Sequence, residues 1–101
     1  MHLSLEGKNA VICGGSQGIG LAIAEELALL GADCTLVARN EALLQSAVQI
    51  LDIALRQQHG YIVADFSNAD AVKKAIEAHV KKEPVHILIN NTVGPPTGSV
   101  L

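Results

Sequence analysis

Residues 13–20 read Cys-Gly-Gly-Ser-Gln-Gly-Ile-Gly and stand between an apolar run and a helical pattern. Glycines at 14, 18 and 20 allow the backbone to approach a bulky anion, because no Cβ blocks the way and a positive φ costs little. The apolar residues 9–13 predict a buried strand and residues 19–27 open a helix, so the turn aims helix N–H groups at a ligand. A phosphate group fits that description, and the strand, turn and helix together predict the start of a dinucleotide-binding unit.

The spacing of these glycines differs from the most widespread dinucleotide-binding pattern. Read from Gly14 they fall as G-x-x-x-G-x-G, whereas the common signature is G-x-G-x-x-G. A glycine-rich turn can also be an ordinary strand-to-helix connection that binds nothing. The residues further along the chain therefore have to decide between the two interpretations.

The rest of the chain alternates between apolar strands and helical patterns. Beyond 9–13, strands are predicted at 34–38, 61–64 and 85–89. The order βαβαβαβ predicts a parallel sheet with right-handed crossovers, and we expect a Rossmann-like α/β fold with strand order 3-2-1-4. Ligands bind at the carboxyl ends of the strands in such sheets.

Two of the helical patterns have recognisable ends. Asn40 is suited to cap a helix that ends near Gly60. The inward apolar positions of this helix are Leu44, Ala47, Val48, Leu51 and Leu55. Ser67 and Asp70 resemble a capping box that opens the next helix, which Pro84 stops.

Composition restricts the possible classes of protein. The 101 residues fit one domain at most, 1–101, and 50% of them are apolar, as in an α/β protein buried on both sheet faces. A net charge of -3 provides no basic surface for nucleic acid or an anionic membrane. Apolar runs stay far below the ~18 residues that span a bilayer, and residues 1–4 lack the apolar core of a signal peptide. We therefore expect a cytoplasmic protein with no nucleic-acid or membrane partner.

The cysteines and histidines show no pattern of a disulfide or a metal site. In paired parallel strands, Cys13 and Cys34 would lie about four residues apart, ~13 Å at ~3.3 Å per residue and beyond the ~7 Å limit for a disulfide. Both are expected to be free thiols. The four histidines are scattered and no CxxC pair occurs, so no metal ligands are predicted.

Polar residues stand after each predicted strand. The second strand leads into Ala38-Arg39-Asn40, the third into Asp65-Phe66-Ser67 and the fourth into Asn90-Asn91-Thr92. The end of the second strand usually meets the adenosine ribose, where an acidic residue would accept hydrogen bonds from the 2′-hydroxyl. Arg39 stands there instead, and its guanidinium suits a 2′-phosphate. NADP is therefore predicted in preference to NAD, although a solvated surface cation is the alternative interpretation of Arg39.

These motifs resemble those of the short-chain dehydrogenases/reductases over essentially the whole chain. That family carries T-G-x-x-x-G-x-G after the first strand, Asp after the third and N-N-A-G after the fourth. The resemblance implies cofactor contacts to the diphosphate and ribose by Gly14, Ser16, Gln17, Gly18 and Ile19, to the adenine by Asp65 and Phe66, and to the nicotinamide ribose by Asn90. Gly20 and Arg39 complete the predicted cofactor-binding set. Residues 90–98 look most similar to 3-oxoacyl-(acyl-carrier-protein) reductase-like members.

The chain departs from the family pattern in three places. Cys13 replaces the Thr of the turn, and Val93 replaces a Gly, where a β-branched side chain resists a positive φ. The chain also ends at Leu101, before the region in which the family carries its catalytic Ser and Tyr-x-x-x-Lys. The one tyrosine, Tyr61, is followed four residues later by Asp65 instead of Lys and is expected to pack in a strand. No catalytic residue is therefore predicted in this chain.

The resemblance implies an NADP-dependent oxidoreductase that transfers hydride between nicotinamide and a carbonyl or alcohol carbon. We expect the chain to supply the cofactor-binding half alone, as an amino-terminal fragment or a truncated product. A non-catalytic nucleotide-binding or interaction module is one alternative. Another Rossmann-like enzyme, such as a methyltransferase, is a second alternative, but Arg39-Asn40 replaces the acidic residue that such enzymes usually need.

The doubly wound fold is expected to be incomplete in this chain. Helices before the third strand cover one sheet face, but only residues 71–80 are available for the other. The strand at 85–89 would end the sheet with unpaired backbone groups along an apolar run. We therefore expect self-association through the exposed sheet edge and face.

Overall fold

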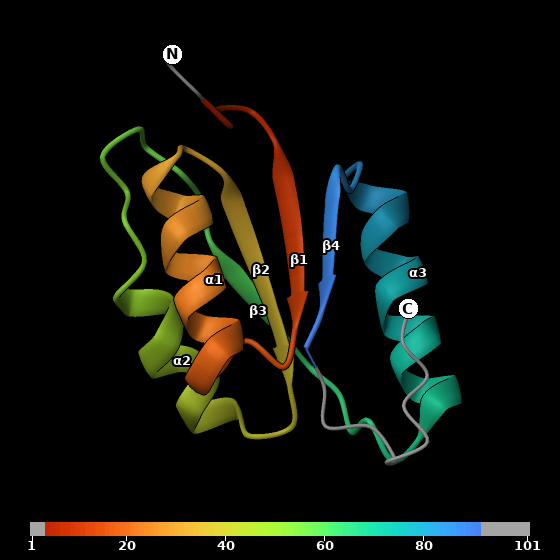
Figure 1. The fold of residues 1–101 in the computed structure, drawn as a ribbon. Helices are drawn as coiled ribbons and strands as arrows, with labels where there is room; N and C mark the ends of the chain where they lie inside the picture. Colours follow the sequence, from red (N-terminus) through yellow and green to blue (C-terminus); the bar gives the residue numbers. More distant parts are fainter. Residues whose placement is uncertain (1–3, 92–101) are drawn as a thin grey trace.

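Four parallel strands form one sheet in the computed structural model, which describes residues 4–91 (Figure 1). The strands are β1 (Asn9–Cys13), β2 (Asp33–Ala38), β3 (Gly60–Val63) and β4 (Ile87–Asn90). They lie in the order β3-β2-β1-β4, which confirms the predicted fold. In this register Cys13 lies opposite both Val37 and Asn90, so β1, β2 and β4 end side by side.

Three helices cover the two faces of the sheet. They are α1 (Gly18–Leu29), α2 (Glu41–Gln49) and α3 (Ala69–Lys82). Figure 1 shows α1 and α2 on one side of the sheet and α3 on the other. This alternation results from right-handed crossovers, which place the connection after β3 on the opposite face because β4 pairs with β1.

The face under α1 and α2 is densely packed. Ile12 and Leu36 point into it from the sheet. The helices cover them with Leu44 and Ala47 of α2 and Ala24 and Ala28 of α1, and all six residues are buried. Small alanines on α1 let the helix lie close to the strands. The face under α3 is thinner, since Val11, Val37, Cys13 and Ala64 are its buried members and no residue of α3 is buried.

The prediction that the second helix ends near Gly60 is wrong. The helix ends at Gln49, Leu51 lies beyond it as a buried residue, and Leu55 is 47% exposed outside it. The segment 50–59 is held by side chains instead: the Gln57 amide donates to the carbonyl of Ala28 at 2.6 Å and accepts from the N–H of Leu55 at 3.0 Å. Tertiary hydrogen bonds of this kind outweigh the local apolar spacing.

The predicted cap of the third helix is also wrong by one residue. Asn68 is the N-cap and its Oδ1 accepts from the N–H of Ala71 at 3.1 Å. Ser67 is already engaged, because its N–H and its hydroxyl both donate to Asp65 Oδ1, at 2.9 and 2.8 Å. The fourth strand begins at Ile87, two residues later than predicted.

Both cysteines are buried free thiols, as predicted. Cys34 lies opposite Ala10, so it is three positions from Cys13 along the sheet instead of four. Burial and the neighbouring Asp33 charge raise the pKa of Cys34 to about 11, and burial raises the pKa of Cys13. The described helices include none long and apolar enough to cross a bilayer. The predictions for Thr92, Val93 and the segment 94–101 lie outside the described residues.

Candidate functional site: a cavity at the carboxyl ends of the strands

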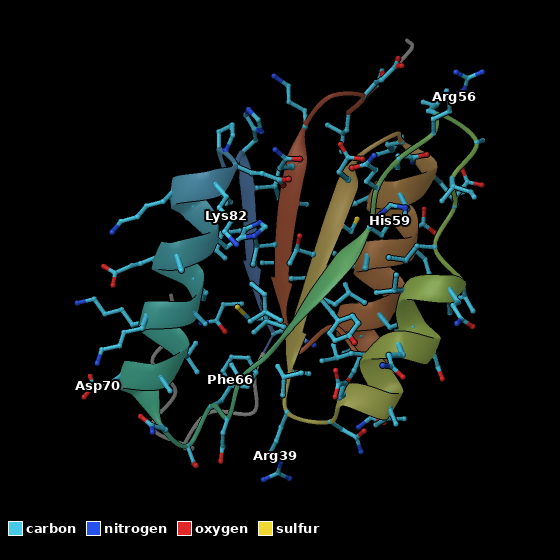
Figure 2. All side chains as sticks on the ribbon, turned by 180° about the vertical axis from the view of Figure 1, so that it is seen from behind. Arg39, Arg56, His59, Phe66, Asp70 and Lys82 are labelled. Atoms are coloured by element: carbon cyan, nitrogen blue, oxygen red, sulfur yellow. The ribbon has the colours of Figure 1, made fainter. Side chains whose placement is uncertain are left out.

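A cavity of about 700 Å³ opens where the strands end. The residues that line it come from the connections after β1, β2 and β3 and from the residue after β4: Gly14, Ser16, Gln17, Gly18, Ile19, Ala38, Arg39, Asn40, Leu43, Asp65, Phe66, Ser67 and Asn91. In Figure 2, Arg39 and Phe66 lie at the same end of the sheet and Arg56 at the other. The cavity therefore lies where the sequence predicts a ligand.

The glycine turn owes its shape to particular positions. Gly14 and Gly18 have φ of 80° and 63°, a backbone conformation that residues with a Cβ rarely adopt. The N–H of Gly14 donates to the carbonyl of Val37 at 2.7 Å, which ties the turn to β2. A Cβ at Gly20 would collide with the carbonyl oxygen of Gly14. Glycine at 20 thus lets the helix approach the turn.

The N-terminus of α1 differs from those of the other two helices. Its N-cap residue, Gln17, makes no side-chain hydrogen bond to the helix, and its first turn carries no acidic residue. In α2 and α3 the N-caps Asn40 and Asn68 each accept a backbone N–H, and Glu41 and Asp70 lie in the first turn. The positive end of the α1 dipole is therefore left for a group outside the helix.

Two charged side chains, Arg39 and Asp65, are among the residues that line this cavity. The pKa of Asp65 is lowered, first because the Ser67 N–H and hydroxyl donate to its carboxylate and further because the Arg39 guanidinium is near. Arg39 is exposed, and Figure 2 shows it pointing away from the body of the protein. Among residues 4–91 the structure gives it no hydrogen bond or ion pair. A guanidinium whose N–H groups make no hydrogen bond can donate to a phosphate or carboxylate group.

Eight of the ten predicted cofactor-binding residues line the cavity. They are Gly14, Ser16, Gln17, Gly18, Ile19, Arg39, Asp65 and Phe66. Gly20 is not among the lining residues and instead packs beneath the turn. Asn90, also absent from the lining, is the last residue of β4, and Asn91 takes the lining position beside it. The Asn91 N–H donates to the carbonyl of Cys13 at 2.9 Å, which holds it at the turn.

Sequence reasoning missed Leu43 as a lining residue. Leu43 is three residues after the N-cap Asn40, on the first turn of α2, and its N–H donates to the Asn40 side chain at 3.1 Å. Leu43 is 40% exposed, and its place at the cavity depends on how α2 is turned over the sheet, which no sequence pattern signals. Tyr61 does not line the cavity; it lies in β3 and packs against the core under α1 and α2, as predicted.

Comparison with known proteins agrees with this geometry. The family model "short chain dehydrogenase" matches residues 8–100. The inactive hydroxysteroid dehydrogenase-like protein 1 of Pongo abelii is 39% identical over 85 residues, covering 84% of this chain and 26% of the relative.

Solved structures of reductases are similar to this chain in both sequence and fold. L-sorbose reductase of Gluconobacter frateurii, complexed with NADPH and L-sorbose, is 35% identical with a TM-score of 0.80, covering 93% of this chain and 36% of that one. A 3-oxoacyl (acyl-carrier-protein) reductase of Agrobacterium tumefaciens with NADP bound is 34% identical with a TM-score of 0.72, covering 90% and 35%. The chain thus spans about a quarter to just over a third of these proteins. The family match, the sheet order and the glycine turn agree, and the chain belongs to the short-chain dehydrogenase family.

Proposed function

We propose that this chain binds NADP(H) in the cavity at the carboxyl ends of its strands, as the cofactor-binding half of an oxidoreductase. The bound cofactor supplies the hydride that is exchanged with a carbonyl or alcohol carbon. The observation that carries the proposal is the uncapped N-terminus of α1, which lies beneath a glycine turn lining the cavity. Backbone N–H groups and the helix dipole favour a phosphate at such a place.

Each predicted residue has a place in this proposal. Gly14, Ser16, Gln17, Gly18 and Ile19 would receive the diphosphate and its ribose, and Asp65 with Phe66 would receive the adenine. Gly20 would contribute by allowing the turn to close on the helix, and Asn90 by holding the end of β4. These residues fit a dinucleotide because they combine free N–H groups, an aromatic ring and a cation around one cavity.

Arg39 supports NADP over NAD. The connection after β2 offers Arg39 and Asn40 to the cavity and no carboxylate that would accept from a ribose 2′-hydroxyl. The L-sorbose reductase structure is a complex with NADPH, and the 3-oxoacyl reductase structure has NADP bound. Similarity to the second of these proteins also supports the finer proposal of a 3-oxoacyl-(acyl-carrier-protein) reductase-like substrate class. A cytoplasmic location stays a prediction from the sequence.

The proton-transfer half of the reaction is proposed to come from elsewhere. The two described hydroxyl side chains on the cavity are those of Ser16 and Ser67, and Ser67 is bonded to Asp65. The Tyr61 hydroxyl donates to Glu41 of α2, and Tyr61 does not line the cavity. The second candidate function is a nucleotide-binding module without turnover, which the name of the inactive hydroxysteroid dehydrogenase-like relative favours.

Self-association is proposed for the edge of the sheet. In the described residues β4 lies at the edge of the sheet and pairs with β1 alone (Figure 1). Leu88 on this strand is 59% exposed. Unpaired edge strands with apolar side chains recruit further strands. Light scattering at micromolar concentration should show association that Leu88→Lys weakens, and a monomer at the same concentration would contradict this proposal.

Calorimetric titration with NADP and NAD tests the cofactor assignment. NADP should bind more tightly, and Arg39→Ala should erase most of the difference, since a charge-assisted hydrogen bond is worth about 1.5–3 kcal/mol. Arg56→Ala is the matched control, because Arg56 lies at the opposite end of the sheet (Figure 2). Equal affinities of the unmodified chain for the two dinucleotides would contradict the assignment.

A further inference from the structure

The hydroxyl of Tyr61 connects β3 to the first turns of α2. It donates to Glu41 Oε2 at 2.9 Å and accepts from Gln45 Nε2 at 3.1 Å. The ring itself packs against the core under α1 and α2, so the direction of the hydroxyl is set by packing. The Gln45 amide occupies the acceptor side of the oxygen, and the phenolic proton is thereby directed to the Glu41 carboxylate.

Glu41 stands two residues after Arg39, with the N-cap Asn40 between them. A carboxylate so close in the chain is a natural competitor for a guanidinium. Asp65 is a second competitor, since the Arg39 charge contributes to its lowered pKa. Both carboxylates are tied to other donors, Asp65 to Ser67 and Glu41 to Tyr61. Arg39 is left without a bonded partner in the described part of the chain.

We propose that Tyr61 is a positioning residue that holds the Glu41 carboxylate away from Arg39. The consequence for ligands rests on the proposed function: Arg39 stays available for the 2′-phosphate of NADP. Without the hydroxyl, the Glu41 side chain is free to swing toward Arg39. An intramolecular carboxylate then competes with the phosphate and weakens the preference for phosphorylated ligands.

Tyr61→Phe removes the hydroxyl and keeps the packed ring. The first readout needs no ligand: the Nε–H NMR signal of Arg39 should move on Tyr61→Phe and return when Glu41→Gln is added. The second readout compares adenosine 2′,5′-bisphosphate with adenosine 5′-monophosphate. We expect Tyr61→Phe to weaken the bisphosphate about two- to fivefold, the range of exposed ion pairs, and to leave the monophosphate unchanged.

The Glu41→Gln background supplies the control. There, Tyr61→Phe should change neither the Arg39 signal nor the ratio of the two affinities. Thermal unfolding of each variant checks that the ring still packs. A merely structural role of Tyr61 would weaken both probes equally, and this outcome would overturn the proposal.

Failure of the proposed function looks different. If the unmodified chain binds neither probe, the cofactor assignment fails, and the Arg39 signal still decides the role of Tyr61. An Arg39 signal that stays in place in Tyr61→Phe, for example because Gln45 takes over the Glu41 carboxylate, would overturn the proposal whatever the chain binds.

Discussion

The first backbone N–H groups of each helix have no partner within the helix, and the three helices differ in whether a side chain accepts from them. Asn40 and Asn68 close α2 and α3 with their own side chains, and an acidic residue stands after each cap. At α1 the cap is Gln17, which makes no such bond. Because capping is worth about 1 kcal/mol, a helix that forgoes it gives up stability. The open end is the one beneath the glycine turn, so the difference separates helix ends that stabilise the fold from the end that is available to a ligand.

The largest effect is expected where the open end meets the turn. Gly20→Ala would place a Cβ against the Gly14 carbonyl, and backbone cannot move aside cheaply. Overpacking of this kind costs about 1–3 kcal/mol of the free energy of unfolding, and it would displace the turn that receives the phosphate. Denaturant unfolding and NADP titration measure the two losses. Gly60→Ala is the matched control, since a Cβ there meets nothing within 4 Å; equal behaviour of the two variants would contradict the packing argument.

A side chain that caps α1 should close its N-terminus in the way that Asn40 and Asn68 close those of α2 and α3. Gln17→Asp is expected to stabilise the fold by about 0.5–1 kcal/mol and to weaken NADP about ten- to a hundredfold, because its carboxylate takes the N–H groups and repels the phosphate. Gln17→Asn separates the two causes, since it caps without a charge. An increase in stability with unchanged NADP affinity would show that the phosphate lies elsewhere.

The converse change removes a cap from a closed helix. Asn68→Ala should lower the free energy of unfolding by about 0.5–2 kcal/mol, because the N–H of Ala71 loses its acceptor. NADP affinity should stay the same, since Asn68 does not line the cavity. Chemical denaturation and calorimetry provide the two numbers, and a loss of NADP binding in this variant would break the proposed separation of roles.

The smallest effect concerns pH. The pKa of Asp65 is lowered in the folded chain by its bonds to Ser67. Its contribution to stability is therefore present above the pKa of the unfolded chain and is lost as the pH falls through the lower, folded value. Asp65→Asn should flatten that part of a stability-against-pH curve. A steeper acid loss in the variant would have the wrong sign.

Much of this arrangement could be predicted from the sequence because local patterns and chirality determine it. The run at 9–13, the glycine turn and the alternation of elements predicted the sheet order and the end at which the cavity lies. The errors arose where tertiary bonds decide. The Gln57 side chain donates a hydrogen bond to the carbonyl of Ala28, 29 residues away, and the segment 50–59 that it holds is a loop where the sequence predicted the end of the second helix. Likewise, the Ser67 hydroxyl donates to Asp65, and Asn68 is the N-cap of α3 in its place.

The Tyr61 contact was beyond sequence reasoning for a similar reason. The sequence predicted that its ring packs in a strand, which is confirmed. Its partners Glu41 and Gln45 are 20 and 16 residues away, on a helix whose rotation over the sheet no local pattern specifies. Leu43 was missed for the same reason, since its place on the cavity depends on how α2 is turned.

The open N-terminus of α1 is central to the proposed function, because it is the place that would receive the phosphates of NADP. Backbone amide chemical shifts measured during an NADP titration test this role most directly, residue by residue. We predict the largest shifts at residues 14–20 and at Arg39, with the capped first turn of α3 unaffected. Saturation with NADP that leaves the amides of 14–20 in place would contradict it.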